Sequence, residues 1–175
     1  GGRTFNQKGW AFSSYLTSRF IHGDFHALWI DPDNSSHLII GSDGGLYISY
    51  DGGDNWEAHP MPVGQFVSVA VDMRKPYYVY GGLQDNGVWG GPSETRHVSG
   101  ISDADWFKVI TGDGGHVQVD HTDFNRIYAE SQYGALTRID LKTGKHQKIR
   151  PSESETGGQL RFNYVSPFII SSHDP

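Results

Sequence analysis

Short apolar runs alternate with turn-forming clusters of Gly, Asp, Asn, Pro and Ser over residues 23–63. The apolar runs cover residues 26–30, 37–40, 46–50 and 55–58. Runs of this length are typical of β-strands, and the gaps between them have the length of tight turns. Because strands joined by tight turns pair with their neighbours in opposite directions, the stretch predicts a four-stranded antiparallel meander.

The same arrangement recurs along the rest of the chain. The run A-L-W-I-D ends at Asp31, and similar apolar runs end at Asp72, Asp120 and Ser171. Their spacing of roughly 40 to 50 residues is the period of a β-propeller blade. Each of the first three runs is followed by further short apolar strands around Gly-containing turns. We therefore predict an all-β chain, a partial β-propeller of four-stranded antiparallel blades.

The period also divides the chain into segments. We expect, in chain order, the end of a preceding blade with a connector, three blades and the first strand of a following blade: 1–22, 23–63, 64–111, 112–160 and 161–175. First strands are expected at 28–30, 69–71, 117–119 and 168–170, and the later fourth strands at 106–109 and 146–149. Three blades are fewer than the roughly four that close a ring. We therefore expect a fragment that the remaining blades of a longer protein, or a second copy of the chain, would complete.

Composition and charge exclude several classes of partner. The formal net charge is -6 and no cluster of Lys and Arg stands out, which argues against nucleic acid or an anionic membrane as a partner. No stretch approaches the roughly 18 apolar residues of a membrane span. The chain has no cysteine, which excludes disulfides and thiolate metal sites but leaves the cellular compartment open.

One turn carries a recognisable motif. The residues from Ser49 to Trp56 match the pattern S-x-D-x-G-x-x-W, with Asn55 where Thr is usual. This pattern resembles the Asp box, and the phrases H-A-L-W-I-D-P and S-D-G-G-L-Y-I-S-Y-D-G-G resemble the Asp-box (BNR-type) propeller superfamily, above all bacterial proteins described as sortilin-like or as glycosyl-hydrolase repeat proteins. The resemblance implies that Ser49 and Asp51 cap backbone N–H groups while Trp56 packs beneath. A secreted or periplasmic location is favoured by the resemblance alone.

Alternate turns of a meander lie at the same end of its sheet. The turn before each first strand therefore shares an end with the turn between the second and third strands. Resemblance to propellers makes that end the mouth of the central channel, where propellers bind ligands. The ligand-binding residues that we predict there are Asp24, Gln65, Gln84, Asp85, Trp89 and Gln132. We interpret the acidic residues of the opposite end as structural: Asp31, Asp51, Asp72 and Asp140.

Two carboxylates at the mouth are candidates for catalysis, because glycoside hydrolysis uses a pair of them. Asp43 lies in S-D-G-G-L-Y. This run is similar to the T-D-x-G-G-x-Y phrase that bears a catalytic Asp in xyloglucan-cleaving glycosidases, with Ser42 for Thr and one residue fewer before the paired glycines. Asp113, in G-D-G-G, is the best positional candidate for the second carboxylate, ahead of Asp24 and Asp85. Alternatively, Asp43 and Asp85 only cap Gly-rich turns for local backbone reasons.

A second constellation suggests metal chemistry. His22, Asp24 and His26 alternate along one segment, so their side chains point to one side of an extended chain. Two imidazoles and a carboxylate suit a zinc ion. A hydrogen-bonded His–Asp pair is the interpretation that we prefer, and we predict no metal and no cofactor.

Two functions from different classes remain open. The first, which we prefer, is a ligand-binding module that recognises a glycan or an extended peptide at the mouth, as the sortilin-type resemblance implies. The alternative is a glycoside hydrolase that acts on a polysaccharide through Asp43 and Asp113. In either case the expected partner is a polysaccharide or a peptide.

Overall fold

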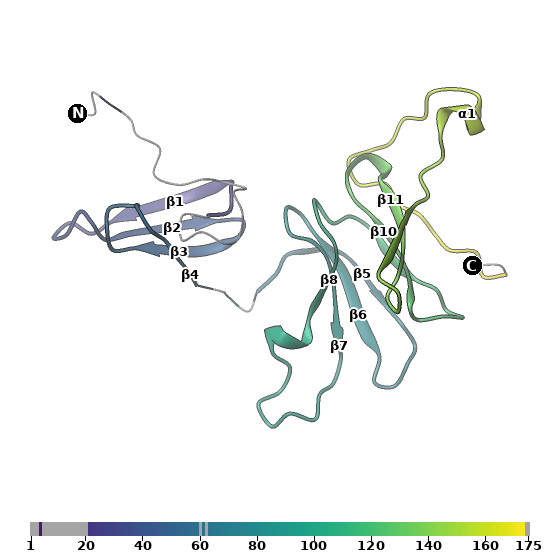
Figure 1. Cartoon of the computed structure of the whole chain (residues 1–175), viewed down its shortest axis with the longest axis horizontal. Coiled ribbons are helices and arrows are strands. Elements are labelled where there is room, and N and C mark those ends of the chain that lie inside the picture. Colours follow the sequence, from purple (N-terminus) through teal and green to yellow (C-terminus); the bar gives the residue numbers. More distant parts are fainter. Residues whose placement is uncertain (1–3, 5–20, 60, 62, 174–175) are drawn as a thin grey trace. The chain divides into compact units, whose positions relative to one another are not determined.

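The computed structural model describes residues 4, 21–59, 61 and 63–173 of the chain. The chain divides into two compact units, residues 1–63 and 64–175, and each unit is described by itself (Figure 1). The described strands form three four-stranded antiparallel sheets. In chain order the elements are β1 (Phe25–Ile30), β2 (Leu38–Ser42), β3 (Gly45–Ser49), β4 (Glu57–His59), β5 (Phe66–Val71), β6 (Tyr78–Leu83), β7 (Gly87–Pro92), η1 (Asp103–Asp105), β8 (Phe107–Ile110), β9 (Val117–Val119), β10 (Arg126–Glu130), η2 (Gln132–Gly134), β11 (Leu136–Asp140), β12 (Lys145–Lys148) and α1 (Glu153–Thr156).

The first unit contains one sheet in the order β1-β2-β3-β4, so each strand pairs with the next one in the chain. Ile40 pairs with Leu28 on one side and with Tyr47 on the other. Residues directly opposite each other across strands point to the same face of a sheet, so these three side chains share a face. On this face Tyr47 packs with Ile21 and Trp56 into a small buried core.

The turn from Ser49 to Trp56 is held by its own side chains. Ser49 Oγ accepts a hydrogen bond from the backbone N–H of Gly53 at 2.9 Å and donates one to Asp51 Oδ1 at 2.9 Å. Asp51 accepts from the backbone N–H of Asn55 at 2.9 Å and from the Asn55 amide at 2.7 Å. These bonds from Asn55, the backbone one foremost, lower the pKa of Asp51 to about 2. The expected capping by Ser49 and Asp51 is therefore observed, and Trp56 is buried.

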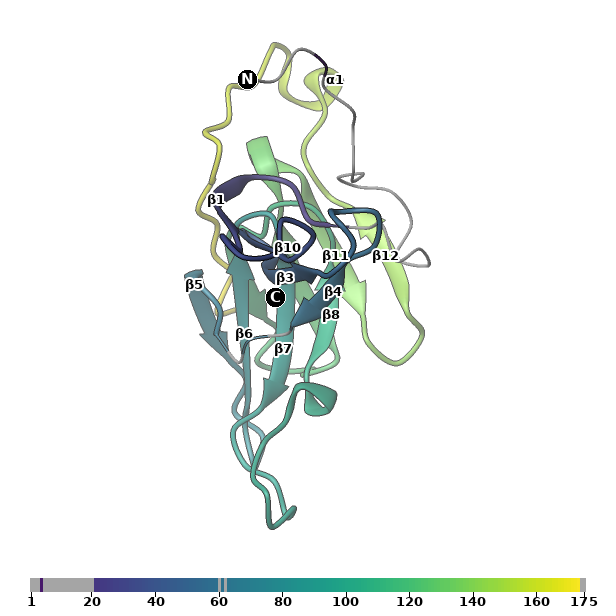
Figure 2. The ribbon, with the colours of Figure 1, turned by 90° about the vertical axis from the view of Figure 1, so that its left-hand side faces the viewer.

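The second unit contains two sheets, in the orders β5-β6-β7-β8 and β9-β10-β11-β12. Strand β9 lies against β5 and β6, so the two sheets pack on each other (Figure 1, Figure 2). Their contact forms the main core. The sheet of β5–β8 contributes Tyr80, Val88 and Val109, and the sheet of β9–β12 contributes Val117, Ile127, Ala129 and Ile139. Each such side chain contributes roughly 1.5–3 kcal/mol when it is large and fully buried. This core fixes the second unit's sheets relative to each other.

Two carboxylates are buried where the first strands of these sheets end. Asp72 accepts hydrogen bonds from the backbone N–H of Tyr78 at 2.8 Å and from Arg74 Nε at 2.6 Å. Asp120 accepts from the backbone N–H and the hydroxyl of Thr122, at 2.8 and 2.6 Å, and from Arg126 Nη1 at 2.7 Å. Burial raises the pKa of Asp120, but the hydrogen bonds outweigh it and hold the pKa below its usual value.

The all-β fold class is confirmed, with sheets of the kind that form propeller blades. The predicted first strands at 28–30, 69–71 and 117–119 lie in β1, β5 and β9, and the later fourth strands are β8 and β12. Among the described residues, no helix has the length and apolar character that a membrane crossing requires.

One expected strand is not formed, since residues 168–170 have no strand structure. A strand needs a pairing neighbour, and no strand of the described part of the chain pairs with this segment. Most of the predicted segment 1–22 lies outside the described residues. The division of the chain into five segments therefore stays a prediction.

We expect acid to unfold this protein through its turn carboxylates. The pKa values of Asp31, Asp51, Asp120 and Asp140 all lie below the ordinary 3.8 in the folded chain. A carboxylate with a lowered folded pKa stabilises the fold above its unfolded pKa, and this stabilisation is lost as the pH falls through the folded value. The free energy of unfolding, measured by urea titration, should therefore decrease steadily between about pH 4 and about pH 2.

The variant Asp51→Asn provides the matched comparison. It should be less stable than the parent at neutral pH and should lose less stability on acidification, because the asparagine does not titrate. A parent protein that is as stable at about pH 2.5 as at about pH 6 would contradict the assignment.

Candidate ligand-binding site

The predicted division of turns between two ends holds within each unit. In the first unit the backbone N–H of Asp43 donates to the carbonyl of Asp24 at 3.3 Å, so the turn before β1 meets the β2–β3 turn. In the second unit the backbone N–H of Asp85 donates to Asp113 Oδ1 at 2.9 Å, which joins the β6–β7 turn to the segment before β9. Asp72 follows β5, at the other end of its sheet. The alternation of turns between the two ends of a sheet therefore places Asp24, Asp43, Asp85 and Asp113 at the predicted end of their units.

Glycines let the segment before β9 pass close to the β6–β7 hairpin. The backbone N–H of Gly114 donates to the Leu83 carbonyl at 2.8 Å, and a Cβ on Gly114 would collide with the carbonyl oxygen of Gly87. The carbonyl of Gly115 accepts a hydrogen bond from Ser68 Oγ at 2.7 Å. Asp113 is thus held at the end of the sheets with its side chain 8% exposed.

A small hollow of about 50 Å³ opens beside Asp113 in the second unit. It is lined by residues from both sheets and from the C-terminal part of the chain: Val67, Gln84, Asp113, Gly114, Gly115, Ser131, Gln132, Tyr164 and Val165. Three predicted site residues, Gln84, Asp113 and Gln132, are therefore brought together. A volume of this size holds one or two water molecules or one small polar group.

The β10–β11 turn forms one side of the hollow. Ser131 Oγ donates a hydrogen bond to Gln132 Oε1, which leaves the Gln132 amide nitrogen as a donor for other groups. Tyr133 follows with a φ of 56°, in the left-handed region that non-glycine residues seldom adopt. Its ring is 57% exposed. The turn thus contributes the amide of Gln132 to the lining of the hollow and carries an exposed aromatic ring next to it in the chain.

The segment 162–166 crosses this turn and forms another wall. The backbone N–H of Tyr133 donates to the Tyr164 carbonyl at 2.9 Å. Glu130 is fully buried, and its Oε1 accepts hydrogen bonds from the backbone N–H groups of Gly134 at 3.1 Å and Ser166 at 3.3 Å. Glu130 is therefore a positioning residue for both walls. The sequence predicted neither Glu130 nor Tyr164, because no motif marks a segment that returns through tertiary contacts.

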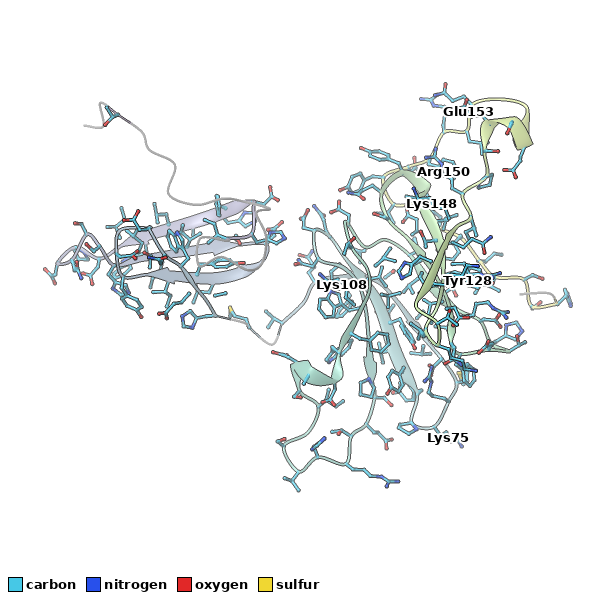
Figure 3. The ribbon with its side chains drawn as sticks, in the orientation of Figure 1. Lys75, Lys108, Tyr128, Lys148, Arg150 and Glu153 are labelled. Atoms are coloured by element: carbon cyan, nitrogen blue, oxygen red, sulfur yellow. The ribbon has the colours of Figure 1, made fainter. Side chains whose placement is uncertain are left out.

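Three other predicted residues of this unit do not line the hollow: Gln65, Asp85 and Trp89. The indole N–H of Trp89 donates to the Asn86 carbonyl at 2.7 Å, and the ammonium of Lys108 lies over the ring at 4.8 Å from its centre (Figure 3). One face of the proposed ring platform is therefore covered. Gln65 is exposed before β5 and does not line the hollow.

In the first unit the predicted residues form a different arrangement. Asp43 is paired with His26 Nε2, and His22 Nδ1 contacts the carbonyl of its neighbour Gly23 at 3.2 Å. Asp24 has a φ of 56° and is exposed. The preferred interpretation as a hydrogen-bonded His–Asp pair fits these contacts, although the aspartate is Asp43 and not Asp24.

Comparison with known proteins gives a distant likeness. No family model matches the chain, and no curated protein matches it. Among solved structures, the chain is similar to an ancestral GH74 enzyme with 16% sequence identity and a TM-score of 0.32, over 84% of this chain and 21% of that enzyme. The chain thus spans about a fifth of that enzyme's length.

We expect Glu130→Ala to destabilise the second unit. The change leaves the backbone N–H groups of buried Gly134 and half-buried Ser166 without their acceptor and opens a cavity, which together cost about 2–4 kcal/mol. Chemical unfolding followed by tyrosine and tryptophan fluorescence would measure the loss. Glu130→Gln keeps a carbonyl acceptor of the same shape and should cost less; equal stability of the alanine variant and the parent would show that Glu130 does not hold these walls.

Proposed function

We propose that this protein is a ligand-binding module that recognises a glycan or an extended peptide at the end of the sheets where Asp113 lies. The observation that carries the proposal is the hollow that gathers Gln84, Asp113 and Gln132 beside Tyr164. Amide and carboxylate groups can donate to and accept from hydroxyl or peptide groups, and a tyrosine adds apolar contact area. Such a combination of a few polar groups with an aromatic ring is typical of small-ligand sites.

The chemistry of the hollow favours binding over hydrolysis. Glycoside hydrolysis needs two carboxyl groups roughly 5–9.5 Å apart. Among the residues that line the hollow, Asp113 is the one that carries a carboxylate, and its Oδ1 is engaged by the backbone N–H of Asp85. The side-chain capping in the turn from Ser49 to Trp56 supports the resemblance to Asp-box propellers, and with it a polysaccharide or peptide as partner.

A binding measurement tests this proposal. Gln84→Ala should weaken retention of the protein by its ligand roughly tenfold, since a good hydrogen bond pair is worth about 1–1.5 kcal/mol. Affinity electrophoresis in gels that contain soluble polysaccharides, together with a peptide array, provides the readout. Gln147→Ala, at an exposed glutamine of β12, is the matched control and should bind like the parent. Equal binding by the Gln84 and Gln147 variants would count against the hollow as the site.

The alternative is a glycoside hydrolase that uses Asp43 and Asp113. It rests on the resemblance of the run around Asp43 to the phrase that bears a catalytic Asp in xyloglucan-cleaving glycosidases. If it is correct, Asp43→Asn and Asp113→Asn should each abolish the release of reducing sugar from polysaccharides while the circular dichroism spectrum stays unchanged. Full residual activity in either variant would reject that residue as a catalytic group.

A further inference from the structure

Two exposed tyrosines contact each other beside the hollow. The rings of Tyr133 and Tyr164 lie 5.2 Å apart, centre to centre, with their planes at 87°. They are 57% and 43% exposed, respectively. Tyr164 lines the hollow, while Tyr133 belongs to the turn that contributes Gln132. The two rings therefore form a right-angled aromatic corner next to the polar lining.

Hydrogen bonds and packing contacts hold the backbone that carries the two rings. The backbone N–H of Tyr133 donates to the Tyr164 carbonyl at 2.9 Å, and buried Glu130 bonds the backbone on both sides of the contact. Phe162 packs against Gly134, where no side chain would fit, and Arg150 lies 4.6 Å over the Phe162 ring. Because the backbone under both rings is fixed, little ordering is required when a ligand binds.

We propose that this corner, made by Tyr133 and Tyr164, is a platform for one sugar ring of a glycan, and that a hydroxyl-bearing substituent of that ring enters the hollow toward Asp113. The inference rests on the proposed binding function and narrows its ligand to a glycan. It replaces Trp89 as the stacking residue, since Lys108 covers one face of that indole.

The amphipathic character of a sugar fits this arrangement. The face of an aromatic ring is negative and attracts C–H groups, which line the flat faces of a pyranose. The hydroxyl groups at the edge of the same pyranose donate to carboxylates and amides such as those of Asp113, Gln84 and Gln132. The hollow of about 50 Å³ admits a hydroxyl or hydroxymethyl group but not a whole ring.

An extended peptide would need other features. Peptides that bind as added strands pair with an open sheet edge and place alternate side chains in pockets. Val67 at the start of edge strand β5 lines the hollow, but the other lining residues belong to turns and connecting segments and offer no run of strand edge for pairing. The site therefore matches a glycan better than a peptide.

Four variants of the full chain test the inference. Tyr164→Ala removes one ring, and Tyr133→Gly removes the other while relieving the left-handed backbone, so its fold should be at least as stable as the parent's. Tyr164→Phe keeps the ring without the hydroxyl. Tyr77→Ala is the control, because Tyr77 is a 47% exposed tyrosine of the same unit. It belongs to the β5–β6 connection, at the other end of the sheet, as does Lys75, which is labelled in Figure 3.

The probes are soluble xyloglucan, mixed-linkage β-glucan, galactomannan and polygalacturonate in affinity gels, and a peptide array. We expect the parent, Tyr164→Phe and Tyr77→Ala to be retarded by at least one polysaccharide, and Tyr164→Ala and Tyr133→Gly to bind it roughly tenfold more weakly. Thermal unfolding checks that each variant is folded.

The other outcomes separate the two proposals. If Tyr164→Ala and Tyr133→Gly are retarded by a polysaccharide as strongly as the parent, the platform is wrong. The proposed binding function would remain. A loss in Tyr164→Phe as large as in Tyr164→Ala would also overturn it, because the hydroxyl and not the ring would then bind. Binding to peptides alone would overturn the glycan assignment. No binding to any probe would refute the proposed function itself, and the platform with it.

Discussion

Capping of backbone N–H groups by carboxylates is the interaction on which this all-β chain depends. The described strands are three to six residues long, so many peptide groups lie outside the ladders and must find acceptors elsewhere. After the first strand of each sheet, after β3 and at the end of β11, aspartates accept from backbone N–H groups of the turn that follows or of the next strand: Asp31 from Asp33, Asp51 from Asn55, Asp72 from Tyr78, Asp120 from Thr122 and Asp140 from Lys142. An ionised acceptor makes the stronger bond. These five of the 20 acidic residues of the chain thus serve to build its turns.

At the opposite end of the second unit, a buried carboxylate, and not a turn aspartate, accepts hydrogen bonds from the backbone N–H groups around the β10–β11 turn. There the buried carboxylate of Glu130 accepts from Gly134 and Ser166, below the surface of the turn. Backbone satisfaction at this turn therefore does not depend on the exposed groups of Gln132 and Tyr133. Asp113 accepts one backbone N–H through Oδ1 and lines the hollow. Moving the structural acceptor inward makes polar groups at the surface available for a ligand.

The alternation of turns between the two ends of each sheet accounts for the part of the site that the sequence predicts. Turns alternate between two ends, so the pattern alone predicts that Gln84, Asp113 and Gln132 lie at the same end. It could not predict Tyr164 or Glu130, whose positions depend on a contact between residues 36 apart in the chain. Nor could it predict that Lys108 would cover Trp89, because this depends on the register of β8 against β7. The short-range pattern of the sequence thus predicts the strands and the ends at which their turns lie, whereas long-range packing contributes the remaining residues of the site.

Of the two residues at the tip of the β10–β11 turn, the fold requires Gly134 but does not require Tyr133. Gly134 has a φ of 70° and lies against the Phe162 ring, so both its backbone conformation and its surroundings require glycine. Tyr133 has a φ of 56°, which costs a residue with a Cβ about 1–2 kcal/mol relative to glycine. Glycine would form the same turn and keep the hydrogen bond from residue 133 to the Tyr164 carbonyl, since that donor is a backbone N–H. The backbone therefore gives no reason for a tyrosine at this position, and the contact that its ring makes in the structure is with the ring of Tyr164.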